Sequence, residues 1–314
     1  MLDKKALTAQ IRAKIIELGF DDMTVAKAEH MTEEVRHLEQ WLHKGYHGNM
    51  SFLEDHFEKR VDPTKLVPGA KSVISLMYNY HSENKQIDPK APKIATYAYG
   101  KDYHRVVKKK LVKLLKWMKI HIGDITIRYF VDSGPVLERD WARRSGMGWA
   151  GKHTLLINKD RGSNFFLAEI ITDIELEYTG PTADHCGTCT RCIDACPTDA
   201  ISEEGYLVDG SKCISYLTIE LKEAIPAEYK GKMADYIFGC DICQQVCPWN
   251  KFATPHNEPK FEPKDNIMQM TKADWINLEE EVYDEIFIGN PLKRAKYSGV
   301  RRNIDFIFDS KDQD

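Results

Sequence analysis

Residues 185–201 read HCGTCTRCIDACPTDAI, and residues 238–250 read FGCDICQQVCPWN. The first run has the spacing C-x2-C-x2-C-x3-C-P and the second has C-x2-C-x3-C-P, so the second run lacks one cysteine. Cys213 lies between the runs and can supply it. Four cysteines for each run account for all eight in the chain. Runs of closely spaced thiols without a secretory signal are typical of metal ligands rather than disulfides.

The spacing of the first run is the one that bacterial ferredoxins use to bind 4Fe-4S clusters, and the last cysteine of each run then crosses to the other cluster. By this rule one cluster takes Cys186, Cys189, Cys192 and Cys247. The other cluster takes Cys196, Cys213, Cys240 and Cys243. Two structural zinc sites are the alternative, since C-x2-C pairs also bind zinc. Zinc requires neither a third close cysteine nor a fourth before proline, so the pattern favours two clusters.

The composition describes an ordinary globular protein rather than a small electron carrier. The chain has 314 residues, which is enough for two or three domains, and a net charge of -4. This charge gives no overall basic signal for nucleic acid, so any RNA contact requires a local patch. The N-terminal residues are charged throughout, and no run of eighteen apolar residues occurs. We therefore expect a cytoplasmic protein that acts as a monomer and does not associate with membranes.

The order of patterns divides the chain into three parts: residues 1–180, a loop-rich cysteine module at 181–255, and a helical tail at 256–314. Apolar periodicity predicts helices near 4–18 and 99–120, the second with a lysine-rich face. Strands are predicted at 20–28, 71–80, 125–132 and 165–172. We expect Thr32 to be the N-cap of a helix and residues 60–70 to form a turn-rich loop.

Several segments outside the cysteine runs carry a more specific signal. They are RVDPTKLVPGAKSVI from Arg60, YAYGKDYHRVVKKKL from Tyr97, VDSGPVLERDWARRSGMGWAGKHTLLIN from Val131 and GNPLKRAKYSGVRRN from Gly289. With the cysteine runs they resemble the epoxyqueuosine reductase family from about residue 40 onward. The resemblance implies an α+β or α/β fold, in which a nitroreductase-like cobalamin-binding domain is fused to a bacterial-type two-cluster ferredoxin domain. It also implies reduction of the epoxide of epoxyqueuosine in tRNA to queuosine, the last step of queuosine biosynthesis, with cobalamin and two 4Fe-4S clusters.

The resemblance assigns Asp132 as the proton donor and as a contact of the cofactor. A carboxyl at the end of a buried strand can have its pKa raised by desolvation, which agrees with that role. On local pattern alone, Asp132 could instead cap the helix that begins near Pro135. The matching positions for the corrinoid are Arg60, Lys152, Ser215 and Asp241. Residues 102–104 begin a D-x-H-x-x-G pattern, but Val107 occupies the glycine position, so we interpret His104 as structural and expect no histidine ligand to cobalt.

The implied partners are a tRNA with epoxyqueuosine in its anticodon loop and an external low-potential electron donor similar to flavodoxin or ferredoxin. The predicted RNA contacts are Lys222, Lys293, Arg294 and Arg301, near Lys296 and Arg302. The lysine-rich helix at 99–120 is the alternative surface. Longer family members continue past the RRN segment into helical repeats, whereas this sequence ends at Asp314. A corrinoid-dependent dehalogenase and an electron-transfer subunit without its own active site are the competing functions.

The cysteine count predicts eight iron and eight sulfide per chain after anaerobic purification. Cys213→Ser should damage one cluster and spare the other, because Cys213 is the only cysteine outside the two runs. Metal and sulfide analysis with EPR spectroscopy checks both expectations. Bound zinc in place of iron, or two intact clusters in the Cys213→Ser variant, would contradict the ligand assignment.

Overall fold

The computed structural model describes residues 3–308. Its centre is a four-stranded antiparallel sheet in the order β1-β2-β7-β4. The strands are β1 (Asp22–Lys27), β2 (Ser72–Asn79), β7 (Phe165–Thr172) and β4 (Ile127–Phe130). All eight residues of β2 are buried, because helices cover both faces of the sheet. The antiparallel pairing agrees with the α+β form of the expected fold class.

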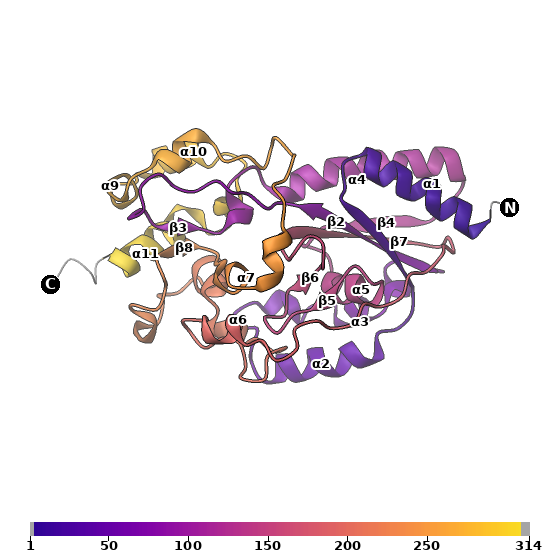
Figure 1. Cartoon of the computed structure of the whole chain (residues 1–314), viewed down its shortest axis with the longest axis horizontal. Helices are drawn as coiled ribbons and strands as arrows, with labels where there is room; N and C mark the ends of the chain where they lie inside the picture. The colour runs from indigo at the N-terminus through magenta and orange to yellow at the C-terminus, as the bar shows by residue number, and fades with distance from the viewer. Residues whose placement is uncertain (1–2, 309–314) are drawn as a thin grey trace.

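Two helices cover one face of this sheet, α1 (Lys4–Glu17) and α4 (Tyr103–Ile122) (Figure 1). In α4 the apolar residues Val107, Leu111 and Leu114 recur at helical spacing and are fully buried. The opposite face is covered by α5 (Glu138–Arg144), with α2 (Thr32–His43) and α3 (Phe57–Val61) farther out. Side chains from one strand therefore enter two different cores, since neighbouring residues of a strand point to opposite faces.

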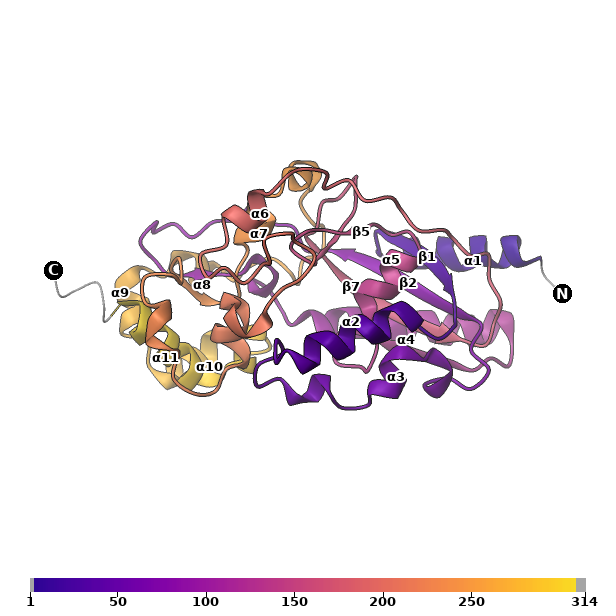
Figure 2. The ribbon, with the colours of Figure 1, turned by 90° about the horizontal axis from the view of Figure 1, so that it is seen from below.

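The cysteine segment lies beside one end of the sheet. It contains two short helices, α6 (Arg191–Asp194) and α7 (Ile242–Gln245), which begin inside the two runs and pack together (Figures 1 and 2). A small hairpin of β5 (Trp149–Ala150) and β6 (Leu156–Ile157) connects this region to α5. Gly239, directly before Cys240, has a φ of 68°, and a Cβ there would lie 2.5 Å from the Ala95 Cβ.

The remaining residues form a second core that draws on distant parts of the chain. β3 (Lys93–Ile94) pairs in parallel with β8 (Tyr236–Phe238). Around this pair pack α8 (Asp265–Gln269), α9 (Lys272–Ile276), α10 (Glu280–Ile286) and α11 (Lys296–Phe308). The buried Asn303 side chain donates from Nδ2 to the carbonyl oxygens of Thr218 and Ile237, both at 2.8 Å. These bonds attach α11 to the cysteine segment.

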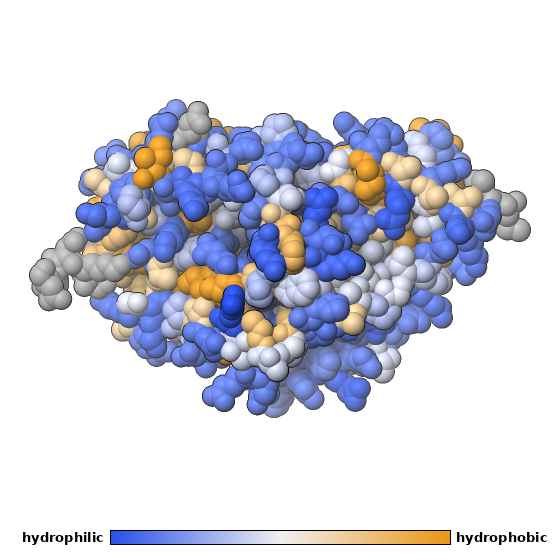
Figure 3. Space-filling view, in the orientation of Figure 1, coloured by the Kyte–Doolittle hydropathy of each residue, from blue (hydrophilic) through white to orange (hydrophobic). Residues whose placement is uncertain are grey.

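Some local expectations from the sequence need correction. Met31 rather than Thr32 precedes α2, and no side chain caps that helix. Residues 60–70 are not a loop throughout, because α3 extends to Val61 and a 3₁₀ turn follows at Pro63–Lys65. Within residues 3–308, no helix has the length and apolar character needed to cross a membrane. The visible face in Figure 3 is largely hydrophilic, with apolar side chains in small separate groups.

Candidate active site

A pocket of about 370 Å³ lies where the sheet meets the cysteine segment. The sheet side contributes Phe165 and Leu167 from β7 and Tyr80 after β2. The hairpin region contributes His153 and Leu155, and Arg139 from α5 also lines the pocket. A third wall comes from residues 196–215 and 240–244. The lining is mainly apolar with a few polar groups, which is typical of cofactor and ligand sites.

The cysteines divide between the pocket and the region behind it. The four that line the pocket are Cys196, Cys213, Cys240 and Cys243. They are also electrostatic neighbours, because Cys213 and Cys196 each raise the pKa of the Cys240 thiol, in addition to the larger effect of burial. This group is the same as the second ligand set expected from the sequence. The structure thus places one predicted cluster site directly against the pocket.

The other four cysteines gather farther from the pocket. Burial raises the pKa of the Cys247 thiol, and the neighbouring thiols Cys186 and Cys189 raise it further. Cys192 in turn has Cys247 and Cys186 as its neighbours. Cys247 packs against Trp149, and Trp249 crosses the Trp149 ring at 4.9 Å between centroids. Three aromatic side chains, Trp249, His185 and the exposed Phe252, extend this group to the surface.

Asp132 lies in the loop between β4 and α5. The strand ends at Phe130, and Asp132 adopts a left-handed φ of 57°, an uncommon conformation for a residue other than glycine. Its backbone N–H donates to Glu138 Oε1 at 2.6 Å, which fixes the turn. Asp132 is not the cap of α5, because that helix begins at Glu138 after Leu137 and has no side-chain cap. The alternative interpretation, in which Asp132 caps the helix that begins near Pro135, is therefore wrong.

The Asp132 side chain belongs to a chain of polar groups at the start of α4. His104 connects two carboxylates, with Nδ1 at 2.7 Å from Asp102 Oδ1 and Nε2 at 3.0 Å from Asp132 Oδ2. Both ring nitrogens face carboxylate oxygens, which favours the doubly protonated imidazolium form of the ring. Tyr103 stacks on His104 and also donates a hydrogen bond to Asp132. His104 thus contacts the expected proton donor, and its interpretation as structural stays a prediction.

Comparison with known proteins decides the family. A family model described as "Epoxyqueuosine reductase QueG, DUF1730" matches residues 60–133, and one for a 4Fe-4S double cluster binding domain matches residues 185–250. The chain is 53% identical over 302 residues to the epoxyqueuosine reductase of Cyclobacterium marinum, covering 96% of both chains. The chain belongs to the epoxyqueuosine reductase family. The Escherichia coli family member is 38% identical, and the match covers 96% of this chain and 81% of that one.

Solved structures of the epoxyqueuosine reductase family have the same fold. One is described as the enzyme with an epoxyqueuosine-modified tRNA stem loop; it has a TM-score of 0.88 at 29% identity and covers 96% of this chain and 80% of that one. The Bacillus subtilis enzyme, described with its catalytic aspartate loop swung out of the active site, has a TM-score of 0.87 at 29% identity and covers 96% and 80%. A catabolic reductive dehalogenase at 16% identity has a TM-score of 0.50, covering 98% of this chain and 39% of that one. This last likeness concerns the fold alone.

In this epoxyqueuosine reductase family member, the ionisation of Asp132 differs from the sequence expectation. Desolvation raises the pKa of Asp132, but the hydrogen bonds from His104 and Tyr103 outweigh it, and the net pKa lies below the ordinary value. For His104, desolvation lowers the pKa, and the hydrogen bonds to Asp102 and Asp132 raise it to about 9 overall. The expected raised pKa of Asp132 is therefore wrong. At neutral pH the transferable proton of this pair resides on His104.

Of the four positions suggested for the corrinoid, two line the pocket. Ser215 and Asp241 are lining residues, and Asp241 Oδ2 also accepts hydrogen bonds from the Thr96 backbone N–H and hydroxyl at 2.7 and 2.8 Å. Arg60 instead donates to the Phe52 and Asp55 carbonyl oxygens. Lys152 packs against the turn at Gly205. Neither Arg60 nor Lys152 is among the described lining residues.

Sequence reasoning missed several residues of this site. His153 is buried in the pocket wall; its Nδ1 accepts from the Leu155 N–H, while its Nε2 has no partner among the described residues. Arg139, Tyr97 and Gln244 also line the pocket. Arg139 lies inside the quoted VLER segment, and His153 directly follows Lys152. Tyr97 begins the quoted YAYGKDYHRVVKKKL segment and Gln244 lies within the second cysteine run, but only the fold shows that both line the pocket.

We expect His104→Gln to remove a pH-dependent part of the stability. The pKa of His104 is raised from its ordinary value near 6.5 to about 9. Its contribution should be fully present below pH ~6.5 and be lost as the pH rises through about 9. After allowance for solvent screening, about 1–2 kcal/mol should separate wild type from the variant at pH 6.

Urea midpoints measured anaerobically between pH 6 and 9.5 provide the test. His37→Gln, on the exposed side of α2, is the matched control and should follow wild type at every pH. A His104→Gln difference that does not shrink toward pH 9.5 would contradict the ion-pair assignment.

Proposed function

We propose that this protein reduces the epoxide of epoxyqueuosine in tRNA to the alkene of queuosine, using a corrinoid and two 4Fe-4S clusters. The reaction consumes two electrons and two protons and releases water. The observation that carries the proposal is the pocket between the sheet and the cysteine segment. One wall of the pocket holds all four cysteines of the second ligand set. Tyr97 also lines the pocket, and the Asp132 carboxylate lies near enough to raise the pKa of Tyr97.

The chemistry of the pocket suits a corrinoid, which is a flat apolar ring with amide groups at its edge. Aromatic and aliphatic side chains supply most of the lining. Ser215 and Gln244 offer polar groups at the wall, and the unpartnered His153 Nε2 can donate to an amide oxygen. Desolvation, followed by the positive charge of Arg139, lowers the pKa of His153 to about 4, so this histidine is neutral. A bound corrinoid would supply strongly reduced cobalt, which an epoxide requires as an electron source.

The two cysteine groups define a direction for electrons. We propose that Cys186, Cys189, Cys192 and Cys247 hold the outer cluster. Cys196, Cys213, Cys240 and Cys243 hold the inner cluster, against the pocket. Electrons from a flavodoxin- or ferredoxin-like donor would enter near the aromatic group of Trp249 and Phe252. The three parts 1–180, 181–255 and 256–314 remain our proposed division, in which residues 91–98 join the core of the later parts.

Protons come from the residues at the start of α4. The imidazolium of His104 donates to Asp132 Oδ2, so the pair holds one proton at a position from which Asp132 can present it to a leaving oxygen. Asp102 accepts from the other ring nitrogen and keeps the ring oriented. The side chain of Asp132 is 60% exposed, which leaves it accessible to a substrate. Protein groups thus orient the substrate and move the proton, while the cofactor supplies the electrons.

The proposed function predicts that the purified protein converts epoxyqueuosine in tRNA to queuosine when a corrinoid and a low-potential reductant are supplied. Asp132→Asn should keep clusters and corrinoid but lose about 10² to 10⁴-fold in turnover, as for a missing general acid. Nucleoside analysis of digested tRNA by mass spectrometry measures the product. Activity without a corrinoid, or a normal single-turnover rate for Asp132→Asn with pre-reduced enzyme, would contradict the assignment.

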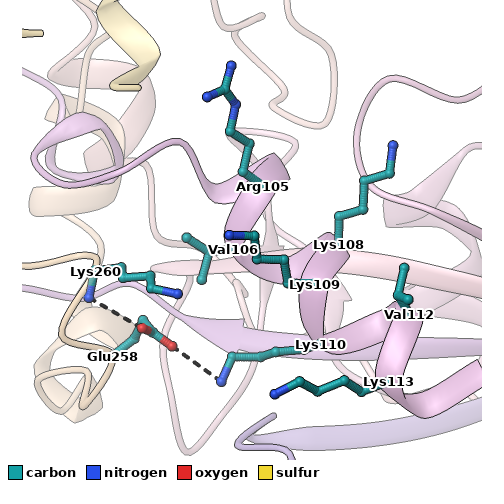
Figure 4. A pocket seen from close by; sticks show the side chains of 9 residues that line it. All are labelled: Arg105, Val106, Lys108, Lys109, Lys110, Val112, Lys113, Glu258 and Lys260. Carbon is teal, nitrogen blue, oxygen red and sulfur yellow. Dashed lines mark hydrogen bonds and ion pairs between the residues drawn. The ribbon is translucent and has the colours of Figure 1, made fainter. Parts of the chain in front are cut away.

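Two surfaces are available for the RNA backbone, and the structure distinguishes them. On α4, the cations Arg105, Lys108, Lys109 and Lys113 project from one face, with Lys260 opposite, around a surface hollow of about 700 Å³ (Figure 4). In this hollow Lys110 bonds to Glu258, while the other lysines and the arginine of α4 form no ion pair among the described residues. The same helix begins beside Asp132, so RNA that reaches the active site can follow this basic face.

Most cations of the C-terminal segment form ion pairs or hydrogen bonds with other residues of the protein. Lys293 pairs with Asp284, and Arg294 makes two hydrogen bonds to Glu220 at 2.6 and 2.9 Å. Arg301 pairs with Asp305. Among the other cations of this segment, Arg302 and Lys222 donate to backbone carbonyl oxygens. Within this group, the charge of Arg294 also lowers the pKa of Asp132. We propose that α4 supplies further phosphate contacts.

We expect Lys108→Ala combined with Lys109→Ala to weaken tRNA binding and to reduce the log-log salt slope by about 0.7–0.9 for each lost contact. Lys293→Ala combined with Arg294→Ala should have a smaller effect, since acidic partners already neutralise both cations. Lys230→Ala combined with Lys232→Ala, both exposed near β8, is the control. Titration of labelled tRNA at several salt concentrations tests this ranking. An unchanged slope in the α4 variant would exclude that helix from the RNA site.

A further inference from the structure

The turn that follows the first cysteine run brings a hydroxyl group back to the sulfur of its last cysteine. The Asp199 N–H donates to the Cys196 carbonyl oxygen at 3.3 Å and closes a turn around Pro197 and Thr198. Proline favours the first central position of such a turn, because its ring fixes φ. Thr198 Oγ1 then lies 3.8 Å from Cys196 Sγ, and the Ala200 N–H donates to the same sulfur at 3.4 Å. Two groups that follow Cys196 in the chain therefore surround its sulfur.

The Thr198 hydroxyl has this sulfur as its hydrogen-bond partner. Thr198 is only 5% exposed, and its Oγ1 forms no other hydrogen bond among the described residues. A cysteine that binds a metal does so as a thiolate, which carries no hydrogen. When the site holds its cluster, the hydroxyl must therefore be the donor and Cys196 Sγ the acceptor. A buried hydroxyl that turned away from the sulfur would lose its hydrogen bond, which is unfavourable.

Thr198 belongs to the pocket wall and has apolar neighbours. It lines the pocket together with Ala200, Ile201 and Val208. In such surroundings a hydroxyl dipole acts on a nearby charge more strongly than it does in water. Hydrogen bonds to the ligand sulfurs are among the factors that set the reduction potential of a 4Fe-4S cluster. Because the reduced cluster carries one more negative charge than the oxidised cluster, the hydroxyl should stabilise the reduced form.

The turn after the second cysteine run has no such hydroxyl. It has the same length, since the Asn250 N–H donates to the Cys247 carbonyl oxygen at 3.0 Å. A proline and Trp249 occupy the centre of this turn, so Trp249 stands where the first run has Thr198. The Trp249 ring packs against Trp149. The two cysteine groups therefore differ at this position, and only one of them has a side-chain hydroxyl there.

We propose that Thr198 is a positioning residue of the inner cluster site, which acts through Cys196 and favours the presence of an electron on the pocket side. For each electron that the inner cluster gains, the outer cluster loses one. A hydrogen bond that stabilises the reduced inner cluster therefore shifts this exchange toward the pocket. The inference rests on the cluster assignment made under the proposed function. It adds to that assignment a side chain that sets how electrons are distributed between the two sites.

A redox titration of the anaerobically purified full chain, followed by EPR spectroscopy, tests the proposal without corrinoid or tRNA. Thr198→Val has a side chain of similar shape without the hydroxyl, and it should lower the midpoint potential of one cluster. Loss of one hydrogen bond should change the electron distribution between the clusters about three- to tenfold. A tenfold change corresponds to about 59 mV for a one-electron couple. The Cys213→Ser variant identifies which EPR signal belongs to the inner cluster.

Three further variants make the test specific to the hydroxyl. Thr198→Ser keeps a hydroxyl and should have potentials close to those of wild type. Thr198→Ala removes the hydroxyl without adding a methyl group, and should lower the same potential if valine prevents cluster binding. Thr190→Val is the matched control, because the Thr190 hydroxyl donates to Asp194 Oδ2 at 2.8 Å rather than to a sulfur. The control should leave both potentials unchanged.

The outcome of the titration decides the role of Thr198. Unchanged potentials in Thr198→Val, an equal shift of both clusters, or a Thr198→Ser variant that behaves as Thr198→Val would overturn the proposal. The titration needs no substrate. A protein that shows the expected shift but is inactive on epoxyqueuosine would therefore refute the proposed function and leave this inference standing.

Discussion

The contact between α6 and α7 is the constraint on which most of this structure depends. It brings the two cysteine runs together although 36 residues, 202–237, separate them in the chain. The chain between α6 and α7 must therefore fold back on itself. This segment brings Cys213, together with Ala200, Ile201 and Val208, to the pocket wall. The second core, formed around β3, β8 and α11, supports the returning segment. The pocket exists because the same arrangement that groups the thiols also places them against β7.

The pKa values of the carboxyls near the pocket depend on the balance between burial, which raises them, and hydrogen bonds from donors, which lower them. Hydrogen bonds from donors lower the pKa of Asp132, whereas burial raises the pKa of Glu138 and of Glu169. Carboxyls with opposite pKa shifts thus lie in one region of the site. His104 connects this group to α4, the helix with the basic face. The proposed proton transfer and the proposed RNA surface thus share one helix, α4.

The surface shows that the number of cations in a segment is a poor guide to their availability. The C-terminal segment and α4 both carry several lysines and arginines, but most of the former have acceptors within the protein. The exposed α4 lysines other than Lys110 have no ion-pair partner within residues 3–308, because their side of the helix faces solvent opposite its buried stripe of Val107, Leu111 and Leu114. A protein with a net charge of -4 can thereby present a locally positive face.

The sequence by itself determined the main helices and strands and the family, and it predicted two groups of four cysteines, because these depend on spacing and periodicity along the chain. It also identified Asp132 as the residue of interest. Only the tertiary structure decided the state of that residue, because the pKa of a carboxyl depends on neighbours such as His104 that are distant in sequence. The buried Glu169 could not be recognised from the pattern of β7, where a single acidic residue lies among apolar ones. Only the fold places this carboxyl in the centre of the sheet, opposite Ser75 on β2 and Phe130 at the end of β4, because strand pairing joins segments that are distant in sequence.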